Sequence, residues 1–170
     1  MRSLTTILFV ATFSIGSAWA VPAATSEIPS ALAIAKSSNR NEVHYAVRVD
    51  GACNPATQAP VHPYWRMLER SNDTTEPLSS LEERAFGIVR QEVEGDSVHF
   101  TLRGLPSRTI TIRTQRAPDG SCAASATMPI SGTAARVSSV WVKQSFFGVS
   151  YVQLTGVAGD GKPVREIVKP

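Results

Sequence analysis

The chain has 170 residues, of which 42% are hydrophobic and 18% are charged, and its formal net charge is +3. This length suits one ordinary domain that can bury a sizeable core, and the composition excludes a wholly disordered chain. Beyond the N-terminus, no apolar run reaches the roughly 20 residues of a membrane-spanning helix, which argues against an embedded protein.

The first 20 residues have the features of a secretory signal peptide. Arg2 supplies a positive charge, residues 4–15 form a short and mostly apolar stretch, and Ala18-Trp19-Ala20 has the small-x-small pattern of a cleavage site. The sequence therefore predicts a periplasmic or secreted protein after cleavage near Ala20, with no transmembrane segment in the mature chain.

Two parts are expected in the mature chain. Residues 21–41 are rich in Ala, Ser and Pro and show no lasting periodicity, so they are predicted to form a flexible tether. Residues 42–170 are predicted to form a single domain, because a two-residue periodicity continues to the end of the chain.

Apolar and polar residues alternate through most of this domain, which is the pattern of half-buried strands. Val43, Tyr45, Val47 and Val49, for example, share one face of their segment. Strands are predicted over residues 43–49, 61–68, 86–93, 97–103, 109–113, 124–130, 137–142, 152–154 and 164–169. A change of phase near Ser138-Ser139 predicts a β-bulge.

One short helix is predicted after a polar loop over residues 72–77. Ser79 with Glu82, or Ser80 with Glu83, can form a capping box that begins it. The sequence thus predicts an all-β fold, an antiparallel β-sandwich of about nine short strands with one short helix. A closed or partly open antiparallel barrel is the alternative.

Cys53 and Cys122 are the two cysteines of the chain. They form no C-x-x-C motif and no Cys/His cluster typical of zinc. In an oxidising compartment the simplest prediction is a disulfide between them, and two separate thiols are the alternative.

Four blocks of the sequence resemble a family of small secreted bacterial domains of unknown function. They are Val43-His44-Tyr45, residues 60–69 (PVHPYWRMLE), residues 77–82 (PLSSLE) and residues 85–88 (AFGI). The resemblance implies a single exported domain, and it implies no activity, substrate or catalytic residue.

Residues 156–163 (GVAGDGKP) come close to a phosphate-binding loop. That loop requires a Ser or Thr after the lysine and a following helix, whereas Pro163 and a predicted strand follow here. We interpret Asp160-Gly161 as a hairpin turn, and the sequence predicts no cofactor.

Side chains of the types common in binding and catalytic sites are most concentrated in residues 60–69. On a strand, His62, Tyr64 and Arg66 share one face and Trp65 lies on the other. The structural interpretation places Trp65 in the core and pairs Arg66 with a carboxylate. The functional interpretation uses Tyr64 as a stacking platform and Arg66 as an anchor for an anionic or sugar-like ligand.

His44, His62 and His99 each occupy a polar-facing position on a predicted strand. If they converged they could bind Zn²⁺ or Cu²⁺. Their spacing does not require convergence, so ordinary surface histidines are the simpler interpretation and no metal site is predicted.

Charge is unevenly distributed, because the only acidic residue between positions 97 and 159 is Asp119, against six basic ones. His99, Arg103 and Arg113 are expected on one outward face of a hairpin, which could hold phosphate or carboxylate groups. Alternatively, acidic residues of the first half neutralise this surface.

These patterns predict an exported domain that binds an anionic polymer or a protein partner in the cell envelope. Nucleic acid is excluded as a partner, because the charge excess is small and the protein is predicted to be exported. The chain lacks G-x-S-x-G and H-E-x-x-H motifs, so catalysis is not predicted. The alternatives are a periplasmic enzyme or metal-binding protein whose site is built from distant residues, and a structural accessory domain.

Overall fold

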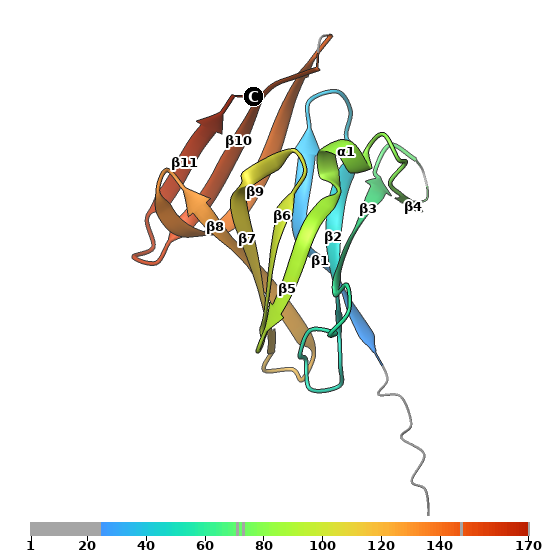
Figure 1. Cartoon of the computed structure of the whole chain (residues 1–170), viewed down its shortest axis with the longest axis vertical. Coiled ribbons are helices and arrows are strands. Elements are labelled where there is room, and N and C mark those ends of the chain that lie inside the picture. The colour runs from blue at the N-terminus through green and yellow to red at the C-terminus, as the bar shows by residue number, and fades with distance from the viewer. Residues whose placement is uncertain (1–24, 71, 73, 147, 170) are drawn as a thin grey trace, which may run out of the picture.

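The computed structural model of the chain describes residues 25–70, 72, 74–146 and 148–169 (Figure 1). The predicted signal peptide, residues 1–20, and the first four residues of the predicted tether lie outside this part. No helix within the described ranges is long and apolar enough to cross a membrane.

The described chain folds almost entirely into β-strands, which confirms the all-β class and the single short helix. Eleven strands are present rather than about nine, because β1 and β4 were not predicted. The elements are β1 Ser26–Lys36, β2 Glu42–Val49, β3 Val61–Met67, β4 Thr74–Pro77, α1 Glu83–Phe86, β5 Ile88–Glu94, β6 Ser97–Leu102, β7 Leu105–Arg116, β8 Cys122–Ile130, β9 Thr133–Ser145, β10 Gly148–Ala158 and β11 Pro163–Val168.

The predicted tether over residues 21–41 is wrong where β1 forms. Ile28, Leu32 and Ile34 point into the core, but the residues between Leu32 and Lys36 on the opposite face are alanines. An alternation of large and small apolar residues gives little polarity contrast, so the periodicity was not recognised. β1 is an internal strand with β2 on one side and β9 on the other.

The strands form one mixed sheet that folds over on itself. Its order is β4-β3-β2-β1-β9-β8-β7-β6-β5, with β10 and β11 attached to the other side of β9. In Figure 1, β5, β6 and β7 lie in front of β1, β2 and β3, which gives the two layers of a sandwich. The expectation of a purely antiparallel sandwich needs one correction, because β1 and β9 are parallel.

β9 connects the two layers. Its first residues pair with β8, and on the same edge Val140–Val142 pair with Ile34–Lys36 of β1. Its other edge pairs with β10 throughout. The register against β10 shifts so that Ser138 is the extra residue, which confirms the bulge predicted near Ser138-Ser139.

The alternative of a closed barrel is wrong, since no backbone ladder joins β3 to β5. A side chain spans the gap between them. The Gln91 amide accepts a hydrogen bond from the Val61 N–H (3.0 Å) and donates one to the Val61 carbonyl (3.1 Å). The amide thereby takes the place of a peptide group.

The core fills the space between the layers. Tyr45, Phe100, Ile110 and Ile112 are fully buried there, and the rings of Tyr45 and Phe100 lie 6.0 Å apart. Burial raises the pKa of Tyr45, whose hydroxyl donates a 2.8 Å hydrogen bond to the Phe86 carbonyl at the end of α1.

The predicted disulfide is confirmed. Cys53, in the loop after β2, is bonded to Cys122 at the start of β8, with 5.4 Å between their Cα atoms. The buried Thr114 hydroxyl donates a 2.7 Å hydrogen bond to the Cys53 carbonyl. We call this the disulfide end; in Figure 1 it lies at the bottom, and the opposite end, which carries α1, is the helix end.

Candidate functional site

Two hollows lie at the helix end, and residues 77–87 contribute to both. Ser79 and Glu82 form the first of the two capping boxes expected from the sequence: Glu82 accepts hydrogen bonds from the Ser79 N–H (2.8 Å) and hydroxyl (2.7 Å). The turn ends at Gly87, where a Cβ atom would lie 2.3 Å from the Glu83 carbonyl oxygen, so only glycine fits without a shift.

The first hollow, which we call the polar groove, has a volume of about 480 Å³. It lies between the β1–β2 turn, β3 and the capping box. Its lining residues are Lys36, Asn39, Asn41, Trp65, Met67, Glu76, Pro77, Leu78, Ser79 and Glu82.

Trp65 is the centre of the polar groove. Its side chain is 95% buried, and the edge of its ring meets Phe86 at a centroid distance of 5.7 Å. The Lys36 ammonium lies 4.1 Å from the centre of the indole ring, in cation–π contact. The indole N–H forms no hydrogen bond within the described residues. It is nevertheless close enough to the Glu82 carboxylate to help lower the pKa of that group. It is therefore a buried donor that a ligand can satisfy.

Lys36 and Glu82 give the groove opposite charges. Burial lowers the pKa of Lys36, although the carboxylates of Glu82 and Glu69 oppose this shift. Burial raises the pKa of Glu82, but hydrogen bonds from Ser79, the neighbouring indole N–H of Trp65 and the charge of Lys36 outweigh it, so the net pKa is below its usual value. Ionisable groups with perturbed pKa values in a hollow are typical of functional sites.

The far wall of the groove is held by side chain to backbone hydrogen bonds. The Asn41 N–H donates to Asn39 Oδ1 and the Glu69 N–H donates to Asn41 Oδ1, each at 3.1 Å. Glu69 in turn accepts a hydrogen bond from the Arg40 N–H at 3.1 Å. These bonds fasten the β1–β2 turn to the end of β3 and hold the groove open.

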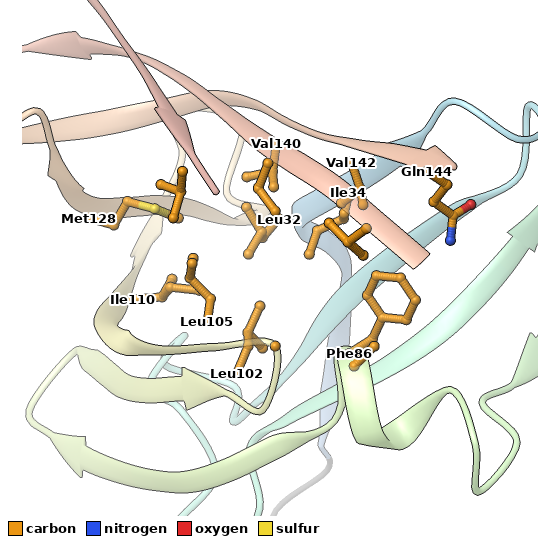
Figure 2. Close-up of a pocket in the computed structure, with 15 residues that line it drawn as sticks. Leu32, Ile34, Phe86, Leu102, Leu105, Ile110, Met128, Val140, Val142 and Gln144 are labelled. Carbon is orange, nitrogen blue, oxygen red and sulfur yellow. The ribbon is translucent and has the colours of Figure 1, made fainter. Parts of the chain in front are cut away.

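The second hollow, the apolar cavity, lies between the layers where β10 and β11 diverge from β8. Figure 2 shows its walls, which Leu32 and Ile34 form on one side and Leu102, Leu105 and Ile110 on another. Its volume is about 250 Å³. Among the 15 described residues that line it, Gln144 is the single one with a polar side chain.

The two hollows adjoin each other. Leu32, Ile34 and Lys36 follow one another on the same face of β1; the first two line the cavity and the third lines the groove. Phe86 lines the cavity and contacts Trp65 of the groove. Both hollows are therefore lined by β1, and the Phe86–Trp65 contact joins their walls.

The predicted Tyr64 and Arg66 surface lies outside both hollows. The Tyr64 hydroxyl donates a hydrogen bond to the Pro29 carbonyl, and its ring lies 5.7 Å from that of His44. Tyr64 therefore fastens β1 across β2 rather than offering an open stacking face. Arg66 is half-buried opposite Glu42 and Thr75 on the neighbouring strands.

His99, Arg103 and Arg113 do not form one anion-binding face. His99 contacts Thr111 at 2.9 Å, and Arg113 pairs with Asp96 at 2.7 Å next to Ser97. Arg103 lies in the turn after β6, so the length of that strand, about 20 Å, separates it from Arg113.

The three histidines also lie apart. His44 and His62 flank Tyr64 on β2 and β3, whereas His99 belongs to the other layer. His62 contacts Glu27 at 3.4 Å. Within the described ranges, no three His, Cys, Asp or Glu side chains are grouped so that they could hold a metal ion.

His44 instead stabilises an outward bulge of β1. Residues 29–31 lie between the pairs Ile28–Val47 and Leu32–Tyr45, opposite a single residue of β2. The Ser30 hydroxyl lies 2.7 Å from His44 Nδ1, and Glu42 Oε2 lies 2.9 Å from His44 Nε2. The result is a Ser–His–Glu chain on the outer face of the sheet, in which His44 is buried, Glu42 is half-buried and Ser30 is exposed.

Neither hollow is predicted from the sequence. Lys36 lies in the predicted tether, Trp65 is interpreted as a core residue, and helix capping accounts for Glu82. The alternation of Leu32, Ile34 and Lys36 was the available signal, because it places a cation at the end of an inward-facing row.

A family model for a domain of unknown function, DUF4833, matches residues 32–167. The match begins within β1 and ends within β11, so it covers both layers as one domain and includes every residue that lines the two hollows except Val168. The family resemblance expected from the sequence blocks is confirmed. The comparisons found no matching curated protein and no matching solved structure.

Proposed function

This chain belongs to the DUF4833 family of domains of unknown function, and we propose that it is an exported, non-catalytic binding domain whose ligand enters the polar groove. The observation that carries the proposal is the meeting of Lys36, Trp65 and Glu82 in one hollow. The disulfide supports export, because such bonds persist in oxidising compartments.

The groove chemistry favours a neutral ligand that carries hydroxyl groups. Lys36 and Glu82 oppose each other in charge, and Glu76 is paired with Arg70, so the groove has little net charge. Lys36 and the Trp65 N–H are donors, whereas Glu82 is an acceptor. A hydroxyl group both donates and accepts, so a sugar unit matches this set, and a volume of about 480 Å³ can hold one.

An anionic envelope component, the partner expected from the sequence, has less support. Arg113 is paired with Asp96, and Arg108 with Glu166. Lys36 has two carboxylates nearby, which would repel an anion.

Tryptophan fluorescence tests the proposal directly. In a variant with Trp19→Phe and Trp141→Phe, Trp65 is the sole tryptophan. Titration with glucose, N-acetylglucosamine, cellobiose and chitobiose should give a saturable change in Trp65 emission with at least one of them. Lys36→Met and Glu82→Gln should each weaken that binding about tenfold or more, because each removes a charge-assisted hydrogen bond. Arg103→Ala, in an exposed turn, is the matched control and should bind normally.

A flat response to all four sugars overturns the proposal. Binding of inorganic polyphosphate that weakens steeply with added salt, without sugar binding, would instead support the anionic partner.

Ester hydrolysis is a second candidate, favoured by the Ser30–His44–Glu42 chain. Its members have the residue types and spacing of a nucleophile, base and orienting carboxylate. The Ser30 hydroxyl would pass its proton to His44 Nδ1 as its oxygen attacks the acyl carbon of an ester. His44 would then give this proton to the departing alcohol, and water would hydrolyse the acyl–serine bond. Covalent labelling by a fluorophosphonate probe, lost in Ser30→Ala and retained in Ser139→Ala, would establish this activity; equal labelling of all variants would exclude Ser30.

A further inference from the structure

The apolar cavity adjoins the groove but the proposed sugar does not use it. We infer that the ligand is an amphiphile, whose hydroxyl-bearing head group occupies the polar groove and whose alkyl chain enters the apolar cavity. This inference rests on the proposed function and names the class of its ligand.

The lining of the cavity suits an alkyl chain. Val140, Val142 and Val152 come from the β9–β10 side, and Leu105 and Met128 come from the opposite layer, so apolar side chains surround the space. An apolar cavity of roughly 150 Å³ stays dry and can hold a benzene ring. The cavity volume of about 250 Å³ exceeds that size. The apolar side chains around the empty space lack van der Waals contacts that a bound alkyl chain would supply.

The cavity also has an entrance. Ala85, Gly104 and Val149 line it and are exposed. A Cβ atom on Gly104 would lie 2.6 Å from the Ala85 carbonyl oxygen, so the two segments approach closely here. Beyond Val149, Phe146 at the hairpin is 97% exposed and extends the apolar surface outward.

Gln144 marks a polar boundary of the cavity. In Figure 2 its amide lies beyond Val142, at one edge of the labelled side chains. Its Oε1 accepts a hydrogen bond from Ser38, and its backbone N–H donates to the Ser37 hydroxyl at 2.9 Å. Ser37 and Ser38 directly follow Lys36, so this polar edge of the cavity leads toward the groove. The junction between the alkyl chain and the head group of an amphiphile would lie here.

A series of alkyl β-glucosides tests the inference. Methyl, butyl, hexyl and octyl glucoside are titrated below their micelle concentrations, with Trp65 emission as the readout. Each methylene that enters the cavity should tighten binding roughly threefold to fourfold, until the cavity is full and the affinity levels off.

Variants that fill the cavity provide the structural control. Val152→Phe and Val168→Phe each add a ring to a cavity wall, and should abolish the gain with chain length while methyl glucoside binds as before. Ile167→Phe is the matched control, since Ile167, the neighbour of Val168 on β11, is half exposed and does not line the cavity. Two filling variants are used so that the test remains valid if one of them does not fold.

The outcomes separate this inference from the proposed function. Equal affinity for all four glucosides, with methyl glucoside bound in the groove, overturns the amphiphile and leaves the sugar site intact. A chain-length gain that survives in both filling variants overturns the assignment to this cavity. Binding of octanol as tight as octyl glucoside, without methyl glucoside binding, overturns both.

Discussion

The two ends of the same folded sheet are built in opposite ways. At the disulfide end, a covalent bond and the buried Thr114 hydroxyl join the two layers. At the helix end, one helical turn lies between two hollows, and a cation, a carboxylate and a buried indole N–H face the larger one. The difference teaches that cross-linking at one end can supply the stability that allows the other end to remain open.

Removing the disulfide should produce the largest effect. The bond joins residues 69 apart, and the chain-entropy model gives about 4 kcal/mol for a loop of this size. Urea unfolding of a Cys53→Ala, Cys122→Ala variant should show a loss of that order. Sugar binding by the fraction that remains folded should not change. An equal free energy of unfolding for the two proteins would refute the stabilising role of the disulfide end.

Truncating core residues compares the packing of the two ends. Ile112 is fully buried between Val98 and Ala126, so Ile112→Ala should cost about 3–4 kcal/mol. Leu105 lines the apolar cavity, and Leu105→Ala should cost about 2 kcal/mol because the site is already loosely packed. Chemical denaturation measures both. Equal costs would show that the cavity wall is packed as tightly as the rest of the core.

Removing one hydroxyl tests how α1 is held. Tyr45→Phe deletes the hydrogen bond to the Phe86 carbonyl and should cost about 1–2 kcal/mol. Amide exchange should accelerate in the α1 turn but not at the disulfide end. Thr114→Val is the control, because it removes a buried hydroxyl at the disulfide end. In this variant amide exchange should accelerate at the disulfide end and not in the α1 turn.

Acid titration gives the smallest expected effect. Because the pKa of Glu82 is lower in the folded state, its ionised form stabilises the fold above the unfolded pKa, near 4.5. That contribution should disappear as the pH falls below about 4.5 through the folded pKa. The melting temperatures of wild type and Glu82→Gln should therefore differ at neutral pH and converge in acid. Glu83→Gln, on the same turn, is the control, and a constant difference across the range would argue against the capping role.

The sequence predicted those features that local residue patterns determine. Nine strands, the Ser79–Glu82 capping box, the extra residue at Ser138 and the Cys53–Cys122 bond all follow from alternation, spacing or composition. β1 is not predicted because its alternation is between large and small apolar residues, and β4 is not predicted because three of its four residues are polar and the fourth is Pro77.

The candidate site could not be predicted in the same way, because it depends on which distant segments meet. Lys36 and Trp65 are 29 positions apart, and their contact requires β1 to be a central strand. The distance between Arg103 and Arg113 could not be predicted from their shared face alone. Both residues belong to one hairpin, but the strand length between them keeps them apart.

The Gln91 amide has a consequence for how this architecture can diverge. Where β3 faces β5, the two free edges are joined through one side chain that reproduces both partners of a peptide unit. An asparagine there, shorter by one methylene, would not reach across. A single conservative exchange would therefore break both hydrogen bonds between β3 and β5, and the two strand edges would offer unsatisfied main-chain groups to any incoming strand.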